Sequence, residues 1–144
     1  METGELRRQI YLALERSKRE AAERRAATDR AAEAYSAFLA DIAVPFVRQV
    51  VSILRADNHL VTAFTPAGSA RVSSDRAAED FVEIVLDETG PVPHVVVRTS
   101  VQRGRAGVNA SAREVAPRKS IDSLTDQDLA DVFVPELLTI LVKT

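Results

Sequence analysis

Residues 81–102 read Phe-Val-Glu-Ile-Val-Leu-Asp-Glu-Thr-Gly-Pro-Val-Pro-His-Val-Val-Val-Arg-Thr-Ser-Val-Gln, and this stretch decides the fold class. Two runs rich in β-branched residues, 81–87 and 94–102, flank a Gly-Pro-Val-Pro connection of the kind that joins strands. In the second run alternate residues belong to the same face of the predicted strand, and one face carries Val95, Val97, Thr99 and Val101. One-sided alternation is typical of an antiparallel sheet with one covered face.

Further strands are predicted on both sides of this stretch. Residues 60–65 and 70–73 flank the turn sequence Pro-Ala-Gly, and residues 108–113 follow a turn at 104–107. In the last run Val108, Ala110 and Ala112 alternate with Asn109, Ser111 and Arg113. We therefore expect an antiparallel meander of about four or five strands.

Two amphipathic helices are the natural cover for this sheet. The first follows Pro45, where apolar residues recur at a period of 3.6. The second runs from about Thr125 to Val142, with Ser123 or Thr125 as its cap and Pro135 inside it. The fold class predicted is α+β: a long N-terminal helix, and a meander covered on one face by two Pro-kinked amphipathic helices.

The long N-terminal helix is predicted from about Glu5 to Ala40. No Gly or Pro occurs between Gly4 and Pro45, and Ala, Glu and Arg dominate the stretch. A helix of this length extends roughly 50 Å at about 1.5 Å per residue, which exceeds the expected core. We therefore divide the chain into a helical arm, 1–43, and a core domain, 44–144; the path of the arm past Pro45 stays open.

A seam at near-heptad spacing runs along this helix, and its two ends are apolar while its middle is not. The candidate oligomerisation residues on it are Ile10, Leu14, Ala21, Tyr35 and Phe38. Two interpretations stand side by side. The helix is solvated with only its ends touching the core, or it forms a weak two-stranded coiled coil.

Composition excludes several classes of function. The chain has 144 residues, a formal net charge of −2 and no cysteine. Disulfide scaffolds, thiolate zinc sites and cysteine nucleophiles are therefore excluded. No phosphate-binding glycine loop or nucleophile elbow occurs. We expect no cofactor and no catalytic residue, although a dispersed active site stays open.

Histidine and acidic clusters are interpreted as structural. His59 and His94 lack the spacing of a zinc motif. The acids of 75–88 alternate with apolar residues, as the solvent side of a strand does. A second group fits the first turn of a helix better than a calcium loop; it consists of Asp122, Asp126, Asp128 and Asp131. We therefore expect no metal site.

Residues 98–119 carry a net charge of +5, and this basic segment is the one sequence feature that points to a binding function. The cations, candidates for anion or nucleic-acid binding, are Arg98, Arg103, Arg105, Arg113, Arg118 and Lys119. A hairpin with arginines on one face binds phosphates. The alternative is that neighbouring acidic segments neutralise these charges.

Three functions follow as hypotheses. The first is a non-enzymatic interaction module that forms a homodimer with the help of its N-terminal helix. The second is a nucleic-acid-associated module that uses the basic hairpin. The third is a small-ligand or enzymatic pocket between the sheet and its two helices. Because no signal-peptide core is present and the apolar stretches are short, we expect a cytoplasmic protein without a membrane partner.

Overall fold

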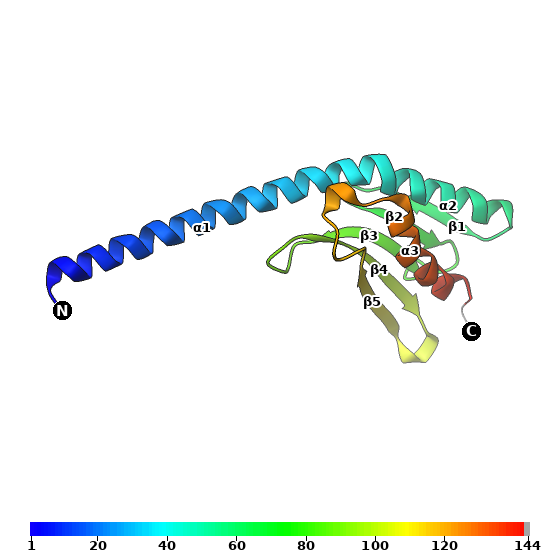
Figure 1. Cartoon of the computed structure of the whole chain (residues 1–144). Helices are drawn as coiled ribbons and strands as arrows, with labels where there is room; N and C mark the ends of the chain where they lie inside the picture. Colours follow the sequence, from blue (N-terminus) through cyan, green and yellow to red (C-terminus); the bar gives the residue numbers. More distant parts are fainter. Residues whose placement is uncertain (143–144) are drawn as a thin grey trace.

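Five strands and three α-helices make up residues 1–142, which the structure, a computed structural model, describes (Figure 1). Lys143 and Thr144, the end of the predicted core domain, lie outside this range. The elements are α1 (Thr3–Phe38), the π-helical turn η1 (Leu39–Ala43), α2 (Val44–Ala56), β1 (Val61–Phe64), β2 (Ala70–Ser74), β3 (Phe81–Asp87), β4 (His94–Gln102), the 3-10 turn η2 (Gly104–Ala106), β5 (Val108–Glu114), the 3-10 turn η3 (Ile121–Ser123) and α3 (Asp126–Leu141).

The five strands form one sheet in the order β1-β2-β3-β4-β5, and each neighbouring pair is antiparallel. This confirms the predicted α+β class and the meander. Strands β3 and β4 begin and end where the alternation predicted. The predicted face of β4 is the covered one, since Val95, Val97, Thr99 and Val101 are all buried, although Val96 on the other face is buried as well.

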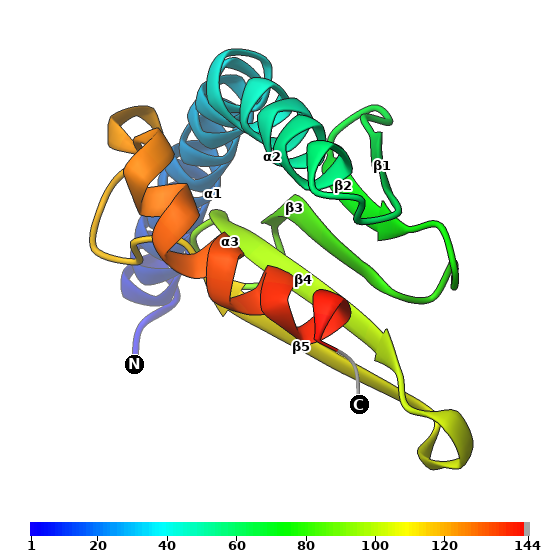
Figure 2. The same ribbon diagram turned by 90° about the vertical axis from the view of Figure 1, so that its right-hand side faces the viewer.

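The helices lie on one side of the sheet, as the end-on view shows (Figure 2). Helix α2 packs over β1 and β2, and α3 packs over β3 and β4. The ring of Phe133 on α3 meets Phe46 on α2 edge-on, with centroids 5.3 Å apart, and fills the space between the two helices. Two helices cover four strands, so β5 lies beyond the helical layer with all seven of its residues exposed.

The two faces of β5 are exchanged relative to the expectation from the sequence, so that the polar residues of the predicted run 108–113, and not its apolar ones, lie on the helix side. Arg113 pairs with Val97, and Ala112 pairs with Arg98, so Arg113 lies on the helix side and Ala112 on the open side. The expectation that arginines share one face of this hairpin is therefore wrong for Arg98 and Arg113. Register is fixed by pairing with β4, and a slip of one residue exchanges the faces.

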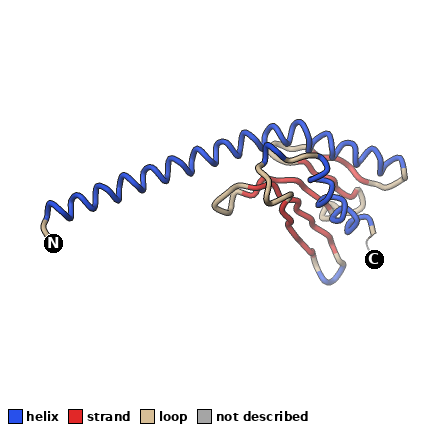
Figure 3. Tube along the Cα trace, viewed as in Figure 1, coloured by secondary structure: helices blue, strands red, loops and turns tan. Residues whose placement is uncertain are grey.

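Pro45 does not end the N-terminal helix. The turn Leu39–Ala43 before it is π-helical, and the N–H of Val44 donates to the carbonyl of Leu39, five residues back. Pro45 then falls in the first turn of α2, where a missing N–H is tolerated. Helices α1 and α2 therefore form one continuous run that changes direction at this turn (Figure 3).

Helix α1 leaves the rest of the fold and projects away from it (Figure 1). Its packed part begins near Ala31 and contains Tyr35 and Phe38, which are 6% and 4% exposed. The residues before Ala31 are exposed, except for the half-buried Ala21. The predicted boundary after residue 43 falls within a packed part of this helix, and the division into an arm and a core domain stays a prediction.

The continuous helix formed by α1, η1 and α2 contains an apolar stretch that is longer than the separate stretches considered in the sequence. Within Thr3–Ala56, an 18-residue window reaches a mean hydropathy of 1.7, and 22% of that window is buried. The helix is therefore long and apolar enough to cross a membrane by length and composition. Core helices of soluble proteins pass the same test, so this is weak evidence. The expectation of no membrane partner stays a prediction.

Candidate interaction site

The exposed end of α1 carries a group of exposed large apolar side chains, which we call the α1 tip. Its members are Leu6, Ile10, Tyr11, Leu12 and Leu14, each 46–61% exposed. Leu6, Ile10 and Leu14 follow one another at intervals of four residues and share one face of the helix. Between the tip and Ala31, no apolar side chain is larger than alanine.

The five candidate oligomerisation residues separate into two groups. Ile10 and Leu14 belong to the α1 tip and are exposed, and Ala21 lies midway along the helix. Tyr35 and Phe38 instead pack into the core of the same chain, with ring centroids 6.4 Å apart. Their apolar character is therefore explained by folding of this chain, which leaves the tip residues to be explained.

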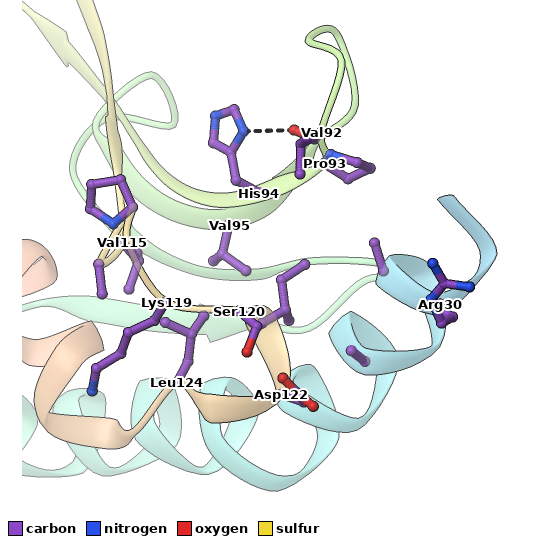
Figure 4. Close-up of a pocket in the computed structure, with 15 residues that line it drawn as sticks. Arg30, Val92, Pro93, His94, Val95, Val115, Lys119, Ser120, Asp122 and Leu124 are labelled. Carbon is purple, nitrogen blue, oxygen red and sulfur yellow. Dashed lines mark hydrogen bonds between the residues drawn. The ribbon is translucent and has the colours of Figure 1, made fainter. Parts of the chain in front are cut away.

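A pocket lies where α1 joins the fold, and we call it the root pocket (Figure 4). It has a volume of about 360 Å³, and its walls come from α1, the start of β4 and the segment between β5 and α3. The lining is mainly apolar and includes Ala31, Ala34, Val95, Val115, Ile121 and Leu124. It lies beside α1, whereas the third hypothesis placed a pocket between the sheet and its two helices, and that hypothesis stays a prediction.

The six cations of residues 98–119 do not form one surface. Arg113 makes an ion pair with Glu136, and Lys119 lies 2.8 Å from Asp128, so α3 neutralises both. Arg98 lies on the opposite face of the sheet from Arg113. It forms no ion pair within residues 1–142, because Arg71 binds the carboxylate of Glu83, the neighbour of Arg98 on β3. Within residues 1–142, Arg103, Arg105 and Arg118 form no ion pair.

Glu136 is a buried acid that the sequence analysis did not single out. Its carboxylate accepts hydrogen bonds from the hydroxyls of Thr99 at 2.9 Å and Ser111 at 3.4 Å, besides pairing with Arg113. This network ties α3 to β4 and β5. An acid between Phe133, Leu137 and Ile140 on an apolar helix face was the available signal, because a buried carboxylate requires partners.

The histidines remain separate in the fold. His59 precedes β1, whereas Nε2 of His94 lies 3.2 Å from Glu114 and 3.6 Å from Asp87. Hydrogen bonds from Thr89, and then the charges of His94 and Arg98, lower the pKa of Asp87. Among residues 1–142, no group of histidines and acids has an arrangement that could hold a metal ion.

The acids at the start of α3 serve the helix itself. The Thr125 hydroxyl accepts from the N–H of Asp128, whose carboxylate accepts from the N–H of Thr125. Hydrogen bonds from Lys119 and then Thr125 lower the pKa of Asp128. This capping box is the structural role that the sequence indicated.

Neither a protein-family model, a curated protein nor a solved structure matches this chain.

Proposed function

We propose that the protein is a non-enzymatic interaction module that forms a homodimer through α1. The observation that carries this proposal is the position of one face of the α1 tip, the face formed by Leu6, Ile10 and Leu14. Its large apolar side chains stand at the far end of a projecting helix, separated from the core by a stretch in which the apolar residues are alanines. Contiguous exposed apolar groups of this kind mark contact surfaces.

An antiparallel arrangement of two α1 helices fits this distribution best. The middle of the near-heptad seam on α1 contains the polar residues Ser17, Arg24 and Thr28. In a parallel pair of helices these residues would face the same residues of the other copy. In an antiparallel pair that crosses near Ala21, the tip of one helix reaches the root of the other. The mainly apolar root pocket supports this arrangement, because it offers a receiving surface at that end.

The expected dimer is a modest one. Complete burial of a Leu or Ile side chain contributes about 1.5–3 kcal/mol, so three from each copy contribute at most about 9–18 kcal/mol. Association itself costs about 4–15 kcal/mol. We therefore expect a dimer that dissociates on dilution.

The test is a triple substitution in the full chain: Leu6→Gln, Ile10→Gln and Leu14→Gln. Light scattering after size exclusion then compares the molar mass over a range of concentrations with that of the wild type. The matched control is Leu12→Gln, because Leu12 is equally exposed but lies on the opposite side of the helix. The proposal predicts a lower mass for the triple variant and little change for the control. An unchanged mass in the triple variant would contradict it.

A further inference from the structure

Strand β5 is an open edge of the sheet. Within residues 1–142 it pairs with β4 alone, and all of Val108–Glu114 is exposed. The N–H of Val115 donates to Val95, and the N–H of Arg103 donates to Gly107, so these pairs are hydrogen-bonded ones. Bonded and non-bonded pairs alternate in antiparallel ladders. The N–H and C=O groups of Val108, Ala110, Ala112 and Glu114 therefore point away from β4.

This edge lacks most of the features that normally prevent pairing. Proteins protect edge strands with proline, with lysine and other charged side chains, with inward-pointing charges, with bulges or with very short length. The charged residues of β5 are Glu114 and the inward-pointing Arg113, whose charge Glu136 neutralises. Residues 108–114 contain no proline and no lysine, and their register with β4 is unbroken over seven pairs. The other edge, β1, has four residues and is followed closely by Pro66. Strand β5 is therefore the edge that is ready to accept another strand.

We propose that β5 pairs antiparallel with β5 of a second copy, about a two-fold axis at Ser111. With Ala110 opposite Ala112 of the second copy, Val108 lies opposite Glu114, and all four outward-pointing residues of each strand are hydrogen-bonded. A shift by two residues in either direction leaves some of these groups unpaired. The small side chains of Ala110, Ser111 and Ala112 place no bulk at the axis.

Charge complementarity favours a second copy as the occupant. In this register the hairpin turn of one copy, with Arg103 and Arg105, lies beside the end of β5 in the other. There a groove of about 700 Å³ between β5 and α3 is lined by the acids Glu114 and Asp131 and by the ion pair of Arg113 with Glu136. Arg103 and Arg105, which form no ion pair within residues 1–142, thus meet two acids, Glu114 and Asp131.

The test uses the full chain and native mass spectrometry over a range of concentrations. Ala110→Pro removes an N–H that points away from β4, and Ala110→Val is the control that keeps it. We expect Ala110→Pro to weaken self-association at least about tenfold and the control to leave it unchanged. Equal association of the two variants would overturn the proposal.

A charge-reversal pair tests the same interface independently. Arg105→Glu is expected to weaken association about tenfold. Adding Asp131→Arg to the same chain is expected to restore it, because the new acid at position 105 of each copy then faces the new cation at position 131 of the other copy, and the two-fold axis makes this contact twice. Arg105→Glu that leaves self-association intact, yet abolishes salt-sensitive binding of a DNA oligonucleotide, would overturn the proposal and assign the turn to nucleic acid.

This inference does not depend on the α1 dimer, and the two can fail separately. If both contacts form, the wild type exceeds a dimer, each set of variants alone reduces the assembly to a dimer, and the combination yields a monomer. If only the β5 contact forms, Ala110→Pro alone yields a monomer and the α1 triple variant changes nothing. A wild type that is monomeric throughout overturns both.

Discussion

The hydroxyl of Tyr35 donates a hydrogen bond to the carbonyl of Gly68 at 2.6 Å, across 33 positions of the sequence. It joins the root of α1 to the turn between β1 and β2. Gly68 has a φ of +84°, a conformation that suits glycine and sets the direction of this carbonyl. The contact fixes the end of the helix from which the arm projects.

Replacing Tyr35 by Phe should lower the free energy of unfolding by about 1 kcal/mol, because one largely buried hydrogen bond is lost while the ring stays packed. For a chain of this size, the melting temperature should fall by roughly 2–4 °C. Tyr11→Phe is the matched control, since Tyr11 is exposed. Equal melting temperatures of the two variants would contradict the role given to the Tyr35 hydroxyl.

High pH should destabilise the fold through the same residue. Burial, and then the charge of Glu83, raises the pKa of Tyr35 from 10.0 to about 12. Between these values the unfolded chain has released the proton and the folded chain has kept it. Stability should therefore be intact below about pH 10 and fall as the pH rises towards 12, by at most about 1.4 kcal/mol per pH unit.

Phenolate absorbance in the Tyr11→Phe chain reports the ionisation of Tyr35 alone. Ionisation of Tyr35 near pH 10 in the folded chain would refute the expected shift.

Truncation should separate the arm from the packed helix. A chain that lacks residues 1–28 should keep a cooperative thermal transition, because Ala31, Ala34, Tyr35 and Phe38 remain. A chain that lacks residues 1–38 loses two buried aromatic side chains. Each is worth about 3–5 kcal/mol, out of a total of about 5–15 kcal/mol. We expect it to be unfolded by circular dichroism, and a folded chain would show that the core begins later.

Thr99→Val should cost about 2 kcal/mol, because it removes a hydroxyl that donates to the buried carboxylate of Glu136. Thr62→Val removes an analogous hydrogen bond, to Asp75, at an exposed position. That control should cost less than about 1 kcal/mol. Urea unfolding of both variants measures the difference, and a smaller effect at Thr99 than at Thr62 would be incompatible with the buried network.

Local patterns predicted the elements of this fold well. The alternation of residues 94–102 defined β4, and the residues before α3 predicted Ser123 or Thr125 as its cap, of which the structure uses Thr125. Both signals depend on neighbours in sequence. The helical continuity across Pro45 was not predictable in the same way, because it depends on a π-helical turn that places the missing N–H where no donor is needed.

The candidate site was less predictable, because it depends on pairing between distant residues. Arg98 and Arg113 each alternate with apolar residues, which predicts that both face solvent on the same side of the sheet. The register of β4 with β5 instead places them on opposite faces. Tyr35 and Phe38 fit a helix seam as well as a core. Only the position of the sheet beneath α1 distinguishes the two possibilities.

The unbroken geometry of α1 has a consequence for how its length can vary. Each residue inserted between the α1 tip and Ala31 advances the tip by about 1.5 Å and rotates it by roughly 100°. An insertion of seven residues returns Leu6, Ile10 and Leu14 to within about 20° of their direction, whereas two residues turn them to the far side. Relatives of this chain with longer or shorter arms should therefore differ in steps close to seven residues wherever the tip binds a fixed surface. The length of α1 therefore sets both the distance of the tip from the core and the direction that the tip faces.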